Sequence, residues 1–157
     1  GHSLVKAKMR ETGALLAGEM SGHVFFKERW YGFDDGLYSG ARLLEILSKV
    51  ANPNTTLNEL PDAVCTPELH IHTAEGENHA LIARLQNEAR FTDAKDVITI
   101  DGLRVEYADG FGLMRPSNTT PVIVLRFEAD DVAALRRIQD DFRRILLSAA
   151  PNLSLPF

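Results

Sequence analysis

The sequence predicts two kinds of fold in one chain, an α/β segment followed by an α+β segment. Up to about residue 62, short apolar strands alternate with helical patterns. After it come one strand, a helix, four consecutive strands and a final helix, an order that favours an antiparallel sheet with helices on one face. The stretch 62–67 has the composition of a linker, so we expect separate domains over residues 1–62 and 63–157.

The first segment is expected to contain three helices and two short strands. Gly13 stops the first helix, and the carboxylates of Asp34 and Asp35 cap the second. Thr56–Glu59 has the pattern of a capping box that opens the third. The expected elements are a helix over 4–12, a buried strand over 15–17, a strand over 24–26, a helix with the apolar stripe Leu37, Ala41, Leu44 and Leu47, and a short helix opened at 56–59.

The second segment combines strand and helix periodicities. In 68–73 apolar residues alternate with His70 and His72, which indicates a half-buried strand with both imidazoles on one side. Asp101-Gly102 is a strong hairpin signal, and Asp130 is expected to cap the final helix. The expected elements are strands over 68–73, 97–100, 103–107, 111–114 and 122–128, a helix over 78–89, and a final helix with the apolar stripe Leu135, Ile138, Phe142, Ile145 and Leu146.

A short polar loop, Gly18-Glu19-Met20-Ser21-Gly22-His23, follows the first expected strand. Its carboxylate can accept hydrogen bonds from two neighbouring hydroxyls, and the serine hydroxyl and the imidazole add donors. That combination suits recognition of a polyol. Ser21 with His23 could also suggest a hydrolase, but the loop lacks the Gly-x-Ser-x-Gly pattern and no orienting acid is marked, so we reject that interpretation.

A second polar loop, Arg115-Pro116-Ser117-Asn118-Thr119-Thr120-Pro121, follows about ninety residues later. Arg115 offers a planar fork of donors that matches two phosphate oxygens, and the side chains after it add hydroxyl and amide donors. The alternative is a loop whose side chains bond only to their own backbone. A sugar-binding loop and a phosphate-binding loop on one chain suggest a phosphosugar ligand.

Both loops, in this order, resemble those of the α-D-phosphohexomutase family, in particular its bacterial phosphomannomutase/phosphoglucomutase branch. The resemblance continues through Val24–Gly36 and Gly110–Gly112 and covers nearly the whole chain, and Met20 is typical of this branch. It implies that residues 1–62 are the C-terminal part of the family's third domain, an α/β domain. Residues 63–157 would be its fourth, a fold similar to half of the TATA-binding protein.

The resemblance also implies roles for individual residues. The family's residues that match Glu19 and Ser21 hold sugar hydroxyls, and the residue that matches His23 lies beside the substrate. His2 is a secondary candidate for the same region. The residues that grip the phosphate not being transferred match Arg115, Ser117, Asn118 and Thr119.

The implied activity of the whole protein is the interconversion of hexose 1-phosphate and hexose 6-phosphate. A phosphoserine and Mg²⁺ would take part, with hexose 1,6-bisphosphate as intermediate and activator. The family's serine loop and its aspartate loop for magnesium do not occur here, so we expect the nucleophile and the metal ligands to lie upstream. This segment would then be inactive alone. The alternatives are a non-catalytic phosphosugar-binding fragment and the phosphoglucosamine mutase branch.

Two further clusters have alternative interpretations. His70 and His72 could form a metal pair, but no third ligand of suitable spacing is present, and a solvated sheet face is the preferred interpretation. Trp30, Tyr31 and Phe33 could form a sugar-stacking platform, although adjacent aromatics after a strand are more often part of a core.

Composition excludes several classes of partner. Seventeen basic against 22 acidic residues give a net charge of -5, which argues against a nucleic-acid surface. No apolar run approaches the roughly 18 residues of a membrane span, and a single cysteine, Cys65, fits a reducing cytoplasm. A third domain without its first part should expose apolar surface, which favours self-association.

Overall fold

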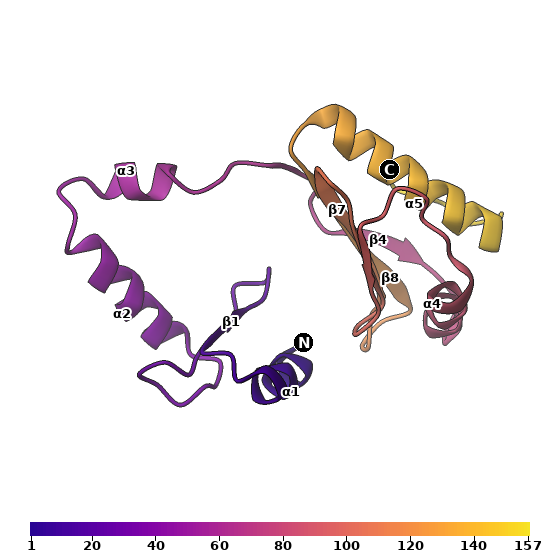
Figure 1. The fold of residues 1–157 in the computed structure, drawn as a ribbon. Helices are drawn as coiled ribbons and strands as arrows, with labels where there is room; N and C mark the ends of the chain where they lie inside the picture. Colours follow the sequence, from indigo (N-terminus) through magenta and orange to yellow (C-terminus); the bar gives the residue numbers. More distant parts are fainter. The chain divides into compact units, whose positions relative to one another are not determined.

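The computed structural model describes all residues from 1 to 157, and the chain forms two compact units, Gly1–Pro61 and Asp62–Phe157 (Figure 1). The first unit combines helices with a two-stranded hairpin, and the second combines helices with a six-stranded antiparallel sheet. The predicted fold class, an α/β segment followed by an α+β segment, is therefore confirmed.

The first unit contains three helices and one β-hairpin. The hairpin strands pair antiparallel, with Leu16 opposite Phe26 and Gly18 opposite Val24. The first helix ends at Gly13, as predicted. In chain order the elements are α1 (His2–Thr12), β1 (Leu16–Gly18), β2 (Val24–Phe26), α2 (Gly36–Leu47) and α3 (Pro53–Asn58).

Burial in the first unit is slight. Only Met9 and Phe25 are buried, and α2 contains no buried residue. Leu15 and Leu16 are more than half exposed, so the expectation of a buried strand over 15–17 is wrong. The hydrophobic stripe of α2 is likewise open to solvent, with Leu37 91% exposed. With only two strands in this unit, no further element covers these side chains.

The capping residues of two helices differ from those predicted. Helix α3 begins at Pro53, because the Asn52 side chain accepts a hydrogen bond from the Asn54 backbone N–H (3.0 Å) and proline suits the first helical position. Glu59, expected near the start of this helix, is its C-cap. The last helix is capped by Asp131, whose carboxylate accepts from the Ala134 N–H (2.8 Å), and not by Asp130.

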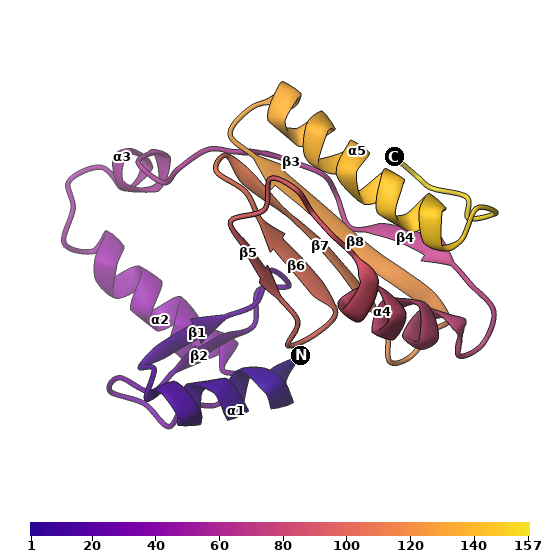
Figure 2. The same cartoon turned by 45° about the vertical axis from the view of Figure 1, so that its right-hand side comes forward.

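The second unit is one antiparallel sheet with both helices on the same face (Figures 1 and 2). Its strand order is β3-β8-β7-β6-β5, and β4 also pairs with β8. The hairpin predicted at Asp101-Gly102 joins β5 to β6. The elements are β3 (Val64–Cys65), β4 (Leu69–His72), α4 (Glu77–Glu88), β5 (Asp96–Ile98), β6 (Leu103–Glu106), β7 (Gly110–Pro116), β8 (Val122–Ala129) and α5 (Val132–Ala149).

The stretch expected as a linker contains strand β3. Val64 and Cys65 pair with the end of β8, and β4 pairs with the same strand further along. Between them, Thr66 binds Phe127 twice, through its backbone N–H (2.9 Å) and through its hydroxyl, which accepts from the Phe127 N–H (3.1 Å). Two residues are too few to show a periodicity, so β3 could not be predicted from the residue pattern.

The core of the second unit lies between the sheet and its two helices. The predicted stripe on α5 is confirmed, since Ile138, Phe142 and Leu146 are fully buried. Phe142 packs so closely against β7 that a Cβ atom on Gly112 would lie 2.4 Å from its ring. Neither α4 nor α5 covers the opposite face of the sheet (Figure 1). That face carries the residues of β4 and β8 that lie beside the second polar loop.

Candidate functional site

The first polar loop is the tip of the β1–β2 hairpin. Two backbone hydrogen bonds close it, from the Glu19 N–H to the His23 carbonyl and from the Gly22 N–H to the Glu19 carbonyl, both 2.9 Å. Gly22 has φ +87°, a left-handed conformation that favours glycine. The turn therefore presents Glu19, Ser21 and His23 on a defined backbone.

Glu19 has an unsatisfied carboxylate oxygen. Its Oε1 is enclosed by protein and has no hydrogen-bond partner, while Oε2 lies 3.8 Å from the amino nitrogen of Gly1. A buried acceptor without a donor is costly, of the order of 1–3 kcal/mol, and a ligand hydroxyl could reach this oxygen only if the atoms that enclose it moved. Ser21 and His2 are exposed, and their side chains make no hydrogen bond within the chain.

His23 is held by Asp34. The imidazole Nδ1 lies 2.6 Å from the Asp34 Oδ2. Because an ionised carboxylate can only accept, Nδ1 carries the hydrogen, and Nε2 remains the free acceptor of the neutral ring. Asp34 reaches this position through an isolated β-bridge to Phe25, next to the hairpin.

Asp34 is thus not a helix cap, and the prediction that both aspartates cap the helix is half wrong. Asp35 is the N-cap: its Oδ1 accepts from the Tyr38 N–H (2.9 Å), which holds the pKa of this carboxyl below its usual value. Its Oδ2 also accepts from the Trp30 indole N–H at 3.0 Å. Two adjacent aspartates can both satisfy a cap pattern, and only the fold shows which one does.

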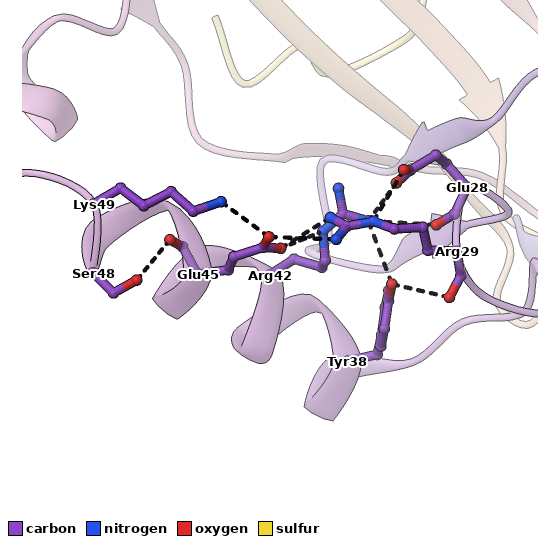
Figure 3. A network of polar contacts seen from close by, with 7 residues as sticks. All are labelled: Glu28, Arg29, Tyr38, Arg42, Glu45, Ser48 and Lys49. Carbon is purple, nitrogen blue, oxygen red and sulfur yellow. Dashed lines mark hydrogen bonds and ion pairs between the residues drawn. The ribbon is translucent and has the colours of Figure 1, made fainter.

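A network of charged side chains ties the segment before Asp34 to helix α2 (Figure 3). The Arg29 guanidinium donates to both carboxylate oxygens of Glu45, and Arg42 binds Glu28 at 2.6 Å. The Tyr38 hydroxyl donates to the Arg29 carbonyl at 3.2 Å. Arg29 lowers the pKa of Glu45 to about 2. Arg29 is the only residue other than glycine with positive φ (58°), a conformation this network helps to hold.

The aromatic residues of this segment are not part of a core, contrary to the preferred interpretation. Trp30, Tyr31 and Phe33 are 37%, 79% and 45% exposed. Trp30 stacks on the ring of Tyr38, with 4.3 Å between centroids and 5° between planes. The aromatic side chains therefore lie on the surface of the first unit, where so little is buried.

The second polar loop joins β7 to β8. Arg115 and Pro116 are the last residues of β7, and Arg115 lies opposite Val124. Backbone bonds close the turn, from the Ser117 N–H to the Val122 carbonyl (2.9 Å) and from the Val122 N–H to the Thr120 carbonyl (2.8 Å).

The donors of this loop divide into used and free ones. The Ser117 hydroxyl oxygen accepts from the N–H groups of Thr119 and Thr120, both at 3.3 Å, and lies 3.0 Å from the Thr120 hydroxyl. The alternative of side chains bonded to their own backbone thus applies to Ser117. The side chains of Arg115 and Asn118 make no hydrogen bond or ion pair, so their donors are available to a ligand.

An open pocket of about 580 Å³ lies over this loop on the uncovered face of the sheet. Three of the four residues predicted to bind phosphate, Arg115, Ser117 and Thr119, line this pocket, whereas Asn118 does not. Strand β4 contributes His70 and His72, which the sequence indicated only as a solvated face. No group of three or more histidine, cysteine or acidic side chains gathers anywhere in the chain to hold a metal ion.

Asn78 supports the loop from beneath, and sequence reasoning missed it. Its side chain, only 2% exposed, comes from α4 and donates to the carbonyls of Ser117 (3.0 Å) and Val122 (3.2 Å). A third carbonyl, that of Thr120, lies at 3.4 Å. It is the one buried polar residue of the chain. A polar residue in the first turn of a helix is too common to mark such a role.

The chain belongs to the phosphoglucomutase/phosphomannomutase family, whose domains it matches over almost its whole length. Residues 1–66 match "Phosphoglucomutase/phosphomannomutase, alpha/beta/alpha domain III", and residues 68–145 match the family's C-terminal domain. No helix is both long and apolar enough to cross a membrane.

Its relatives include named mutases. A phosphoglucomutase of Neisseria meningitidis serogroup A is 62% identical over 99% of this chain, and a phosphomannomutase/phosphoglucomutase of Pseudomonas putida is 57% identical over all of it. A crystal structure of a family member from Burkholderia thailandensis is 69% identical over the whole chain, with a TM-score of 0.89. The chain spans about a third of the length of these proteins.

Proposed function

We propose that this chain binds the substrate in a phosphohexomutase that interconverts hexose 1-phosphate and hexose 6-phosphate, with mannose and glucose as the sugars. The observation that carries the proposal is the unpaired guanidinium of Arg115 in a pocket with the hydroxyls of Ser117, Thr119 and Thr120. A planar cation without an internal partner, among hydroxyl donors, suits a phosphate that stays in place while another is transferred.

In the sugar loop, Glu19 would accept from two vicinal hydroxyls of the ring. Ser21 adds a donor and acceptor. His23, oriented by Asp34, would present Nε2 toward the ligand and can hold or release a proton there. Contacts to hydroxyls near the middle of the ring and to a phosphate at one end can form with the sugar in either orientation. A mutase requires both orientations.

The relatives are about three times as long as this chain, and we assign the phosphoserine and the magnesium ligands to that further length. Magnesium would stabilise charge on the phosphoryl group in transfer. This chain's residues would position the substrate and the bisphosphorylated intermediate. The chain alone is expected to show no mutase turnover. Magnesium-dependent turnover by a pure preparation would contradict the assignment of the phosphoserine and the magnesium ligands to the rest of the protein.

The direct test is binding of glucose 1-phosphate to the 157-residue chain, followed by nuclear magnetic resonance. Arg115→Ala should weaken binding by roughly tenfold to a hundredfold, because a hydrogen bond to a charged group is worth about 1.5–3 kcal/mol. Arg136→Ala is the matched control, since Arg136 is exposed on α5 and has no ion-pair partner. Equal losses in both variants would refute a specific phosphate site.

Kinetics of the same changes in the complete enzyme would test the roles of the loops. Arg115→Ala removes a contact present in ground and transition states, so KM should rise more than kcat falls. Arg115→Lys should recover only part of the loss, because a point charge does not replace the fork. Glu19→Ala should lower kcat as well, because the ring position then varies. A preference for an amino sugar would instead favour the phosphoglucosamine mutase branch.

A further inference from the structure

The open face of the second unit's sheet brings two histidines beside Arg115. His70 is paired with Val124, and Val124 is paired on its other side with Arg115, so His70 and Arg115 lie in one row across three strands. His72 is paired with Val122, whose carbonyl accepts from the Ser117 N–H. Side chains alternate along a strand, so both imidazoles stand on the face that Arg115 occupies.

We propose that His70 and His72 are part of the anion site, so that the pocket binds phosphate more strongly when the imidazoles are protonated. This proposal rests on the phosphate-binding function proposed above and adds two ligand-binding residues to it. Both histidines line the same pocket as Arg115, Ser117 and Thr119. A protonated imidazole has two N–H donors and a positive charge, and it titrates between about pH 5 and pH 8.

The surroundings favour this role. Val122 and Val124, which lie between the histidines and β7, carry no charge that would neutralise the imidazoles. Glu68 is the one acidic group in the pocket, and its Oε1 lies 2.9 Å from the His70 Nε2. Arg115 on β7 is the cation in the pocket, and Arg126 follows on the same face of β8. His72 has no acidic partner, so its charge would be fully available to the ligand.

The test must separate the protonation of the protein from that of the ligand. A phosphate monoester loses its second proton at about pH 6, whereas sulfate keeps its two charges from about pH 5 to pH 8. We would therefore titrate the 157-residue chain with sulfate and with glucose 1-phosphate at about pH 6 and about pH 8. Comparing each variant with the unaltered chain at the same pH cancels the ligand's own titration.

The double variant His70→Gln/His72→Gln should bind both anions about tenfold more weakly at about pH 6 and within about twofold of the unaltered chain at about pH 8. Lysine in the His72→Lys variant carries its charge at both pH values, so the pH dependence of binding should decrease to the part that His70 contributes. His79→Gln is the matched control, because His79 is exposed on α4 and does not line the pocket. Dispersed amide resonances would verify that each variant is folded.

The outcomes distinguish this proposal from the one it rests on. If Arg115→Ala abolishes binding while the double glutamine variant follows the unaltered chain at both pH values, the phosphate site stands and the histidine role is wrong. If Arg115→Ala binds like the unaltered chain, the phosphate function itself fails. Loss of sulfate binding in the double variant by the same factor at both pH values would show a structural effect and would also overturn the proposal.

Discussion

The two polar loops have very different support. The second polar loop, over Arg115–Pro121, closes a six-stranded sheet whose core contains sixteen buried residues, and a buried asparagine holds its carbonyls. The first polar loop, over Gly18–His23, closes a two-stranded hairpin in a unit with two buried side chains, and surface ion pairs hold its surroundings. The difference teaches that one loop is positioned by packing, whereas the other is positioned mainly by polar contacts, which are individually weaker.

Separating the two units should give the largest effect. Residues 63–157 are expected to fold alone with a cooperative thermal transition, because they contain the whole sheet and both covering helices. Residues 1–62 should not, because two isolated strands and exposed helices bury too little apolar surface. Circular dichroism melts of the two halves test this. A cooperative melt from the first half would show that residues 1–62 also fold stably, and the difference in packing between the two units would then not limit folding.

Asn78 should reveal how the packed unit holds its loop. Asn78→Leu removes the donors to the Ser117 and Val122 carbonyls inside a buried site, which should cost about 1–3 kcal/mol of unfolding free energy. Sulfate binding should weaken as well, because the loop loses its anchor. Urea unfolding and the anion titration measure the two effects. Asn87→Leu, on the exposed side of the same helix, is the control and should change neither.

In the first unit, substitution of Asp34 tests the residue that holds His23 in the first polar loop. Asp34→Asn replaces the acceptor-only carboxylate with an amide that can either accept from the His23 Nδ1–H or donate to Nδ1, so both tautomers of the ring should become populated. The ¹⁵N chemical shifts of the imidazole report this directly. In the complete enzyme, kcat should fall more than KM changes. If the ¹⁵N shifts of His23 stay as they are, the hydrogen bond does not set the tautomer.

The smallest effect should come from acid titration of Glu45. Because Arg29 lowers the folded-state pKa of Glu45 from 4.5 to about 2, the pair stabilises the fold above the unfolded-state pKa. That contribution is lost as the pH falls from 4.5 toward 2. The Glu45→Gln variant should therefore lose less stability over that range in circular dichroism melts. Glu59→Gln, at an exposed position without an ion pair, is the control.

The second unit was predictable from sequence because its local signals and its packing agree. The stripe on α5, the alternation in β4 and the Asp101-Gly102 turn each indicate the structure that the core then buries. In the first unit the same kind of pattern predicted burial of Leu15 and the α2 stripe, which the structure leaves exposed. An apolar pattern shows which face needs a partner and does not show that a partner is there.

The candidate site was predictable only in its loops. Glu19, His23 and Arg115 stand in compact motifs with recognisable chemistry, so short-range sequence is enough to find them. Asp34, Asn78 and His70 act across eleven to about forty-five residues of sequence, through pairings that only the folded chain brings about. The sequence offered a competing explanation for Asp34 and His70, as a helix cap and as a solvated strand residue.

The pairing of β8 also bears on how this unit is made on the ribosome. Strands β3 and β4 have β8 as their partner, with Val64 opposite Ala129 and His72 opposite Val122. Synthesis proceeds from the N-terminus, so these early strands have no partner until β8 has left the exit tunnel. The hairpin of β5 and β6 can form sooner, from neighbouring residues. Until β8 has left the exit tunnel, the nascent chain therefore exposes the unpaired backbone and apolar residues of β3 and β4 to chaperones and to other nascent chains.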